Sequence, residues 1–219
     1  MTKRFLLAGI SVCLCINSYS QSNNPATELS GKQLFGDLQA RQIGPALMSG
    51  RVTDLEPNPE NSRVFYVGTA GGGVWKSLDG GATVVSVFDE HPQSIGNIAV
   101  DPNDPQTVWV GTGETWTRNS TSAGFGMYKS TDGGSNWKEV PGFEKSERIS
   151  SIEINPNNSD EVYVGVLGAL WGDSEHRGVY KTTDGGESWE KIFYIGPGTG
   201  VSDLVMDPND PNTLYASMW

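Results

Sequence analysis

Cysteine is nearly absent from this 219-residue sequence. Its only two copies, Cys13 and Cys15, lie within the first twenty residues, and histidine is limited to His91 and His176. Two histidines without a later cysteine exclude disulfide bridges, thiol chemistry and an ordinary structural zinc site from residues 21–219. The sequence therefore predicts no metal centre and no cofactor.

Positive charge and long apolar runs are also scarce. The chain has 15 Lys+Arg against 26 Asp+Glu, a net charge of −11, and such a surface disfavours nucleic acid as a partner. The longest apolar run, Phe5 to Ile16, is shorter than the roughly 20 residues that a spanning helix needs. No nucleophile elbow, P-loop or dinucleotide fingerprint occurs. We expect no nucleic-acid partner and no transmembrane segment after removal of the leader described next.

The first twenty residues have the features of a secretory signal peptide. Lys3 and Arg4 precede the apolar run, and Ser18 and Ser20 place small residues at the −3 and −1 positions of a cleavage site. The sequence therefore predicts a signal peptide over residues 1–20, an N-terminal lead-in over 21–43, and a secreted, periplasmic or cell-envelope location.

Glycine, with 28 copies, is abundant and marks the turns of an internal repeat. One pattern recurs at VTDLEPNPENSRVFYVG, NIAVDPNDPQTVWVG, SIEINPNNSDEVYVG and SDLVMDPNDPNTLYAS, and a second at GVWKSLDGGATV, GMYKSTDGGSNW and GVYKTTDGGESW. Asp79, Asp132 and Asp184 recur at a period of about 50 residues, which is typical of propeller blades built from short strands.

Apolar–polar alternation and turn residues divide one period into four strands. In the second unit we expect strands over 94–100, 107–111, 126–130 and 136–140, forming a four-stranded antiparallel meander. The predicted fold class is all-β: a β-propeller over residues 44–219 with three complete blades and half of a fourth. Because propellers typically close with four to eight blades, we expect a fragment of a longer protein whose remaining blades are partners of this region.

The second pattern resembles the Asp-box, or BNR repeat, of secreted β-propellers. Ser130 to Trp137 and Thr182 to Trp189 follow the motif Ser/Thr-x-Asp-x-Gly-x-x-Trp, whereas Val84 replaces the tryptophan in the first copy. The resemblance implies a structural role, in which the aspartates accept hydrogen bonds within their hairpins and the tryptophans bury their rings. The residues concerned are Asp79, Asp132, Asp184, Trp137 and Trp189.

The topology predicts that the DPNDP-type turns and the Asp-box turns share one end of the blades. The opposite end carries two long connections, from Gly113 and from Gly168, and we call it the long-loop face. Binding residues usually lie on such loops, although packing between blades or simple solvation would give the same composition. We expect His176 to be solvated and His91 to be an exposed connector. The candidate ligand-binding residues are Arg51, Glu114, Trp116, Arg118, Arg148, Trp171, Asp173, Glu175, His176 and Arg177.

Several families share this repeat, and the chain is similar to each in a different way. Sialidases open with an Arg-Ile-Pro signature that this chain matches poorly. The chain resembles the start of xyloglucan-type endoglucanases more closely, but Ala70 stands where that resemblance implies a catalytic aspartate. Sortilin-type domains and photosystem II assembly factors bind peptides or proteins instead, and the exported, acidic character looks most like sortilin-type proteins.

Three functions remain open from the sequence. The favoured prediction is an exported binding module for a protein, peptide or glycan, acting through the long-loop face. The alternative is a carbohydrate-active hydrolase whose catalytic residues lie partly in further blades, and the third is a purely structural propeller. A hydrolase requires two carboxylates about 5–10 Å apart in a cleft. The candidates on the long-loop face are Glu114, Asp173 and Glu175.

Overall fold

The computed structural model describes residues 50–219, and its regular elements there are all strands. The predicted signal peptide and lead-in lie outside these residues. Within residues 50–219 no helix is long and apolar enough to cross a membrane.

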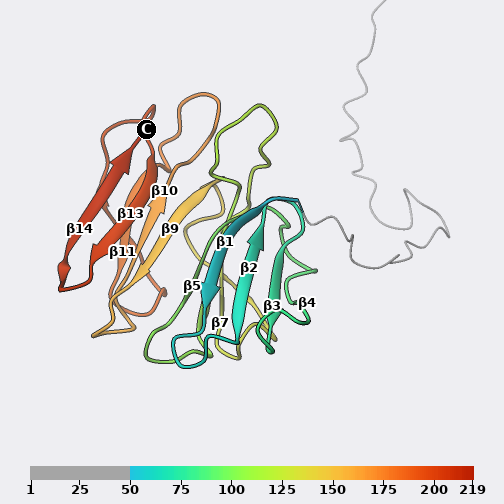
Figure 1. Ribbon diagram of the computed structural model, residues 1–219. Coiled ribbons are helices and arrows are strands. Elements are labelled where there is room, and N and C mark those ends of the chain that lie inside the picture. The colour runs from blue at the N-terminus through green and yellow to red at the C-terminus, as the bar shows by residue number, and fades with distance from the viewer. Residues whose placement is uncertain (1–49) are drawn as a thin grey trace, which may run out of the picture. The chain divides into compact units, whose positions relative to one another are not determined.

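The strands form consecutive antiparallel meanders, which confirms the predicted fold class (Figure 1). The second blade follows the predicted strands to within two residues. Its tight turns and long connections alternate between opposite ends, as the meander requires. The first blade contains β1 (Val52–Pro57), β2 (Phe65–Thr69), β3 (Val74–Ser77) and β4 (Val85–Ser86); the second contains β5 (Ile95–Val100), β6 (Val108–Thr112), β7 (Met127–Ser130) and β8 (Lys138–Val140); the third contains β9 (Ile149–Ile154), β10 (Val162–Val166), β11 (Gly178–Thr182) and β12 (Glu190–Phe193); β13 (Val201–Asp207) and β14 (Asp210–Met218) form a two-stranded sheet.

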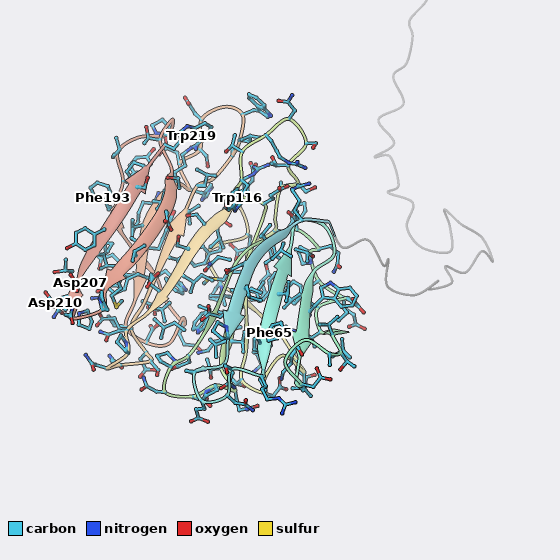
Figure 2. All side chains as sticks on the ribbon, in the orientation of Figure 1. Phe65, Trp116, Phe193, Asp207, Asp210 and Trp219 are labelled. Carbon is cyan, nitrogen blue, oxygen red and sulfur yellow. The ribbon has the colours of Figure 1, made fainter. Side chains whose placement is uncertain are left out.

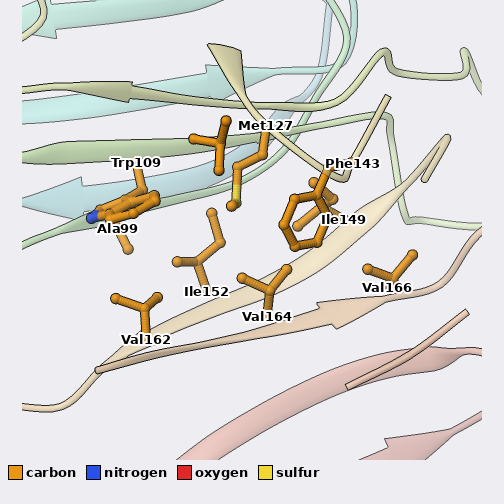
Figure 3. Close-up of a cluster of buried hydrophobic side chains, with 10 residues drawn as sticks. Ala99, Trp109, Met127, Phe143, Ile149, Ile152, Val162, Val164 and Val166 are labelled. Atoms are coloured by element: carbon orange, nitrogen blue, oxygen red, sulfur yellow. The ribbon is translucent and has the colours of Figure 1, made fainter. Parts of the chain in front are cut away.

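The apolar core lies between the blades rather than within one. The second strands β6 and β10 are buried at every position, because their two faces pack against neighbouring blades. Figure 3 shows the cluster between the second and third blades, in which Trp109 and Met127 face Ile152 and Val164. This continuous packing makes the described blades a rigid support for the loops at either end.

The innermost strands are joined by side chains that accept backbone hydrogen bonds from the next blade. Asp54 Oδ2 accepts from the Ile98 N–H at 2.6 Å, and Asn97 Oδ1 accepts from the Ile152 N–H at 2.8 Å. Ser151 Oγ accepts from the Leu204 N–H at 2.9 Å. In each of these three blades, one polar side chain thus accepts a hydrogen bond from a backbone N–H on the edge strand of the next sheet, which would otherwise be left unpaired.

Each Asp-Gly-Gly turn is held by its own aspartate. We call residues 77–84, 130–137 and 182–189 the DGG turns. Asp132 Oδ1 accepts from the Asn136 N–H and from Ser130 Oγ, both at 2.8 Å. The hydrogen bond from the Asn136 side chain, together with these two, lowers the Asp132 pKa to about 2, because all three stabilise its ionised form. The equivalent bonds occur around Asp79 and Asp184.

The DGG-turn tryptophans are only partly buried, and they contact the preceding blade as well as their own turn. Trp137 donates its indole N–H to the Val87 carbonyl at 2.8 Å, and Trp189 packs edge-on against Phe143 with ring centroids 4.9 Å apart. The predicted burial beneath the hairpin is therefore incomplete, because part of each ring covers the junction between two blades.

We expect the free energy of unfolding to depend on pH because of Glu56, a partly buried carboxyl group on the innermost strand β1. Burial raises its pKa to about 7, above the ordinary value of 4.5. A raised carboxyl pKa means that the folded state binds the proton more tightly, so stability falls as pH rises from about 4.5 to 7. We expect Glu56→Gln to stabilise the protein by about 1–2 kcal/mol at pH 8, after allowance for solvent screening, and to have little effect at pH 4.

Urea unfolding at pH 4, 6 and 8 measures this difference. The exposed Glu60 provides the matched control, since Glu60→Gln should leave the pH profile unchanged. A Glu56→Gln gain that is equal at all three pH values would contradict the proposed burial effect.

Candidate functional site

The two long loops, 113–126 and 168–178, lie together at one end of the blades (Figure 1). The DGG turns lie at the other end, where the Gly133 and Gly185 N–H groups donate to the Gln106 and Asp160 carbonyls. In the first blade the corresponding connection is only residues 70–73. On the long-loop face, the second and third blades therefore carry long connections, whereas the first blade carries a short one.

Glu114 is a buried carboxylate at the start of the second-blade loop. Its side chain is 1% exposed, and its Oε1 accepts from the Arg51 Nε at 3.0 Å and from Arg51 Nη2. Arg118 Nε lies 3.6 Å from the same oxygen. A buried carboxylate is stable only with such partners. The three residues therefore form a charge cluster that ties the first blade to the second-blade loop.

Arg148, immediately before β9, connects the two long loops. It is 4% exposed. Its guanidinium donates to the Glu114 carbonyl at 3.1 Å and to the Gly168 carbonyl at 3.5 Å. It also contacts the Glu147 carboxylate at 3.3 Å and Thr121 Oγ1 at 3.4 Å. Arg148 thus holds backbone from both loops in one arrangement.

Arg177 performs a similar role within the third-blade loop. Its guanidinium donates to the carbonyls of Leu167 and Ala169 at 2.7 Å each, and to that of Gly172 at 3.0 Å. Because Arg148 and Arg177 are buried and bonded to backbone, the structure places them beneath the loop surface. Their geometry is that of residues that position the loops.

Trp116 and Trp171 lie on the loop surface itself. Their side chains are 70% and 81% exposed, one on each long loop. Figure 2 labels Trp116 at this end of the molecule. Asp173, two residues after Trp171 in the chain, is exposed, and Glu175 accepts a hydrogen bond from the Tyr194 hydroxyl at 2.8 Å. Two flat apolar rings therefore face solvent, and the third-blade loop also carries these two carboxylates.

The two histidines are less exposed than the sequence suggested. His91 is half-buried, and its ring packs at a tilt against Phe88 and Tyr128, with ring centroids 4.7 and 5.0 Å apart. Burial lowers the His91 pKa. The prediction of an exposed connector is wrong for His91, because the connection folds back over the aromatic core of the second blade. His176 is half-buried, and its carbonyl accepts from the Tyr180 hydroxyl at 3.0 Å.

Sequence reasoning missed the small residues at the base of the second-blade loop. The Gly113 N–H donates to the Ser94 carbonyl at 2.7 Å, and the Gly124 N–H donates to the Glu147 carbonyl at 2.6 Å. Ser94 Oγ also accepts from the Glu114 N–H at 3.0 Å. The available signal was that Gly113 and Gly124 bracket the loop, but glycine is too common in this chain to single them out.

One cavity lies away from the long-loop face. A cavity of about 470 Å³ lies at the opposite end, lined by Asp132, Asn136 and Glu187 among others, between the second and third DGG turns. Among residues 50–219, no three His, Cys, Asp or Glu side chains come together as metal ligands.

Comparisons with known proteins find similarity to proteins named xyloglucanases. The sequence matches no family model. It is 26% identical over 179 residues to a xyloglucanase of Hypocrea jecorina, covering 74% of this chain and 20% of that protein. It is also 26% identical over 207 residues to the xyloglucanase Xgh74A of Acetivibrio thermocellus, covering 85% and 22%.

Solved structures support the propeller fold. An ancestral GH74 enzyme aligns with a TM-score of 0.60 at 24% identity, covering 76% of this chain and 22% of that one. The GH74 enzyme of Niastella koreensis aligns with a TM-score of 0.58 at 24% identity, covering 76% and 26%. The chain is therefore similar over most of its length to xyloglucanases, and it spans about a fifth of the length of the curated relatives it matches.

Proposed function

We propose that the protein is a carbohydrate-active β-propeller that binds xyloglucan, or a closely similar β-linked glucan, across its long-loop face. The observation that carries this proposal is the exposure of Trp116 and Trp171 on two adjacent loops. Flat indole rings offer a large apolar surface for stacking against the faces of sugar rings. The relatives named xyloglucanases make a glucan the favoured class of ligand.

The buried arginines support this function by holding the loops before a ligand binds. Arg148 bonds to both loops, and Arg177 bonds to three carbonyls around the base of the third-blade loop. A loop that is already ordered loses little conformational entropy on binding, which favours affinity. Arg148 and Arg177 are thus proposed as positioning residues, and the tryptophans as ligand contacts.

Glycan hydrolysis would require a pair of catalytic carboxylates on this face. Glycoside hydrolysis uses two carboxylates beside the scissile bond, but the Glu114 carboxylate is 1% exposed and held by Arg51. Glu114 therefore serves as a structural carboxylate in our proposal. Asp173 and Glu175 are this chain's exposed candidates, and further catalytic groups would come from parts of a longer protein.

Binding without hydrolysis is the second candidate function. It is favoured by Ala70, a buried residue at the position where the resemblance to xyloglucan-type enzymes implies a catalytic aspartate. Release of reducing ends from xyloglucan separates the two candidates, because a pure binding module retains affinity without producing new reducing ends.

Export is part of the same proposal. A protein that acts on a polysaccharide outside the cell must leave the cytoplasm, and the predicted signal peptide over residues 1–20 would provide the route. The Asp-box interpretation of the DGG turns is supported by the bonds around Asp79, Asp132 and Asp184. The sortilin-type interpretation, with a protein or peptide ligand, is the less favoured form of the binding-module proposal.

Affinity measurements on the full chain test the proposed glycan site. We expect Trp116→Ala and Trp171→Ala each to weaken xyloglucan binding by about five- to thirtyfold, because each removes an exposed stacking surface worth roughly 1–2 kcal/mol. Affinity gel electrophoresis and titration calorimetry with xyloglucan measure the change.

Leu78 provides the matched control, since it is 63% exposed but lies in the first DGG turn at the opposite end. Leu78→Ala should leave xyloglucan affinity unchanged. Binding that survives both tryptophan substitutions, or that depends on Leu78, would remove the long-loop face from consideration.

A further inference from the structure

Glu147 has a backbone conformation that the chain otherwise gives only to glycine. Its φ is +58°, and among residues 50–219 it is the one residue other than glycine with a positive φ. Fourteen glycines adopt positive φ in the same part of the chain. A residue with a side chain is strained in this conformation, because its Cβ crowds the backbone. A glutamate at such a position therefore points to a role for its side chain.

The strain at Glu147 is held by a tight turn. The Arg148 N–H donates to the Ser146 carbonyl at 2.7 Å, so Glu147 is the central residue of a three-residue turn. With a positive φ at its centre, this is the rare and strained form of the γ-turn. Ser146 is fixed in its place by the Phe143 carbonyl, which accepts from its N–H at 3.0 Å and from its hydroxyl at 2.8 Å. The surrounding structure thus determines where the Glu147 side chain begins.

This turn lies where the two long loops meet. It belongs to the connection from β8 to β9, which the meander places at the long-loop face. The Glu147 carbonyl accepts from the Gly124 N–H, near the end of the second-blade loop, at 2.6 Å. Arg148 Nη1 contacts both the Glu147 carboxylate, at 3.3 Å, and the Gly168 carbonyl at the start of the third-blade loop, at 3.5 Å. Glu147 is therefore placed between the loops that carry the two exposed tryptophans.

The Glu147 carboxylate is accessible, and its contact with Arg148 does not account for the strain. The Glu147 side chain is 45% exposed, and within the described part of the chain its Oε1 accepts no hydrogen bond. An ion pair with a half-exposed partner adds little to stability. Arg148 has further acceptors in the Glu114 and Gly168 carbonyls and in Thr121 Oγ1, so its hydrogen bonding does not depend on Glu147.

We propose that Glu147 is a ligand contact of the glycan site, where its carboxylate accepts hydrogen bonds from sugar hydroxyl groups. This inference rests on the proposed function and adds a residue to it. Tryptophan rings offer apolar surfaces for sugar rings but do not fix which way a sugar points. A carboxylate held between the loops accepts from hydroxyl groups in a defined direction, and it therefore orients the bound glycan. The strained turn holds the carboxylate in place before the glycan binds.

Two substitutions separate the side chain from the strained backbone. Glu147→Gly removes both the carboxylate and the strain, whereas Glu147→Gln removes only the charge. We expect Glu147→Gly to unfold about 2–4 °C above Glu147→Gln in scanning calorimetry. In titration calorimetry, Glu147→Gly should nevertheless bind a xyloglucan oligosaccharide about tenfold or more weakly than the unmodified chain. Glu147→Gln should weaken binding by a smaller factor, because an amide oxygen is a weaker acceptor than a carboxylate.

A second measurement distinguishes direct contact from an effect through Arg148. Amide hydrogen exchange of the ligand-free Glu147→Gln variant should be unchanged in residues 113–126 and 168–178, because Arg148 keeps its carbonyl partners in both loops. Glu139 provides the matched control, since it is an exposed glutamate that lines the cavity at the opposite end. Glu139→Gln should leave xyloglucan affinity unchanged.

Four results would overturn the inference. If Glu147→Gly binds xyloglucan as tightly as the unmodified chain does, the proposed function stands without Glu147. If the affinity loss comes with faster exchange in the two loops, Glu147 positions the loops and does not contact the glycan. If Glu147→Gly is no more stable than Glu147→Gln, the strain is absent. If the unmodified chain does not bind xyloglucan, the proposed function fails first, and the role of Glu147 in it fails as a consequence.

Discussion

Replacing Arg51 with alanine is expected to destabilise the protein by about 3 kcal/mol, because the substitution leaves the buried Glu114 carboxylate without its main partner. Arg51 donates two hydrogen bonds to Glu114 Oε1. The Arg51 side chain is itself 45% exposed, and Arg118 remains 3.6 Å from the same Glu114 oxygen. Both facts keep the cost at the lower end of the range for a broken buried pair. Chemical unfolding of the full chain at pH 7 measures the difference.

A double variant shows how much of the Arg51→Ala effect comes from the unpaired Glu114 carboxylate. Arg51→Ala combined with Glu114→Gln should recover about 1–2 kcal/mol, because a neutral amide is less costly to bury than an unpaired carboxylate. Arg63→Ala removes an exposed arginine from the same blade and should change stability by less than about 0.5 kcal/mol. No recovery in the double variant would show that Glu114 is not the residue affected.

Gly113→Ala is expected to destabilise the protein by about 4 kcal/mol or to prevent folding. Gly113 has a φ of +94°, and an added Cβ would lie 1.9 Å from the Glu147 carbonyl oxygen and 2.8 Å from the Gly124 nitrogen. These are backbone atoms at the base of the second-blade loop, so they cannot move aside as a flexible side chain would. The yield of soluble protein and its urea midpoint measure the effect.

Two other glycines separate the contribution of the positive φ from that of the close backbone contact. Gly142 also has a positive φ, of +93°, but an added Cβ there meets nothing within 4 Å. Gly142→Ala should therefore cost only about 1 kcal/mol, through backbone strain alone. Gly71→Ala has neither a positive φ nor a contact and should be neutral. A Gly113→Ala cost no larger than that of Gly142→Ala would contradict the proposed backbone contact.

The fold could be predicted from the sequence because the same strand and turn pattern recurs in each repeat. Each period contains the same alternation and the same turn residues, so the strand boundaries of one blade reinforce those of the others. The innermost hydrogen bonds were predictable in principle, because Asp54, Asn97 and Ser151 occupy the same position of each unit. A polar residue recurring on an otherwise apolar strand is the signal that points to them.

The arrangement of the candidate site was less predictable. The sequence placed ten residues on the long-loop face, but it could not distinguish the buried arginines from the exposed tryptophans. Arg148 and Arg177 are buried because loop carbonyls converge on their guanidinium groups, and that convergence depends on irregular backbone without a repeating pattern. The burial of His91 was also not predicted, because its contacts with Phe88 and Tyr128 arise in a connection that has no repeating pattern.

Amide hydrogen exchange of the full chain, with and without a xyloglucan oligosaccharide, shows which surface of the protein binds the glycan. We expect slower exchange in residues 113–126 and 168–178 when the oligosaccharide binds, with unchanged exchange in the three DGG turns. Protection confined to the DGG turns or to the cavity between them, or no protection at saturating oligosaccharide, would contradict a glycan site on the long-loop face.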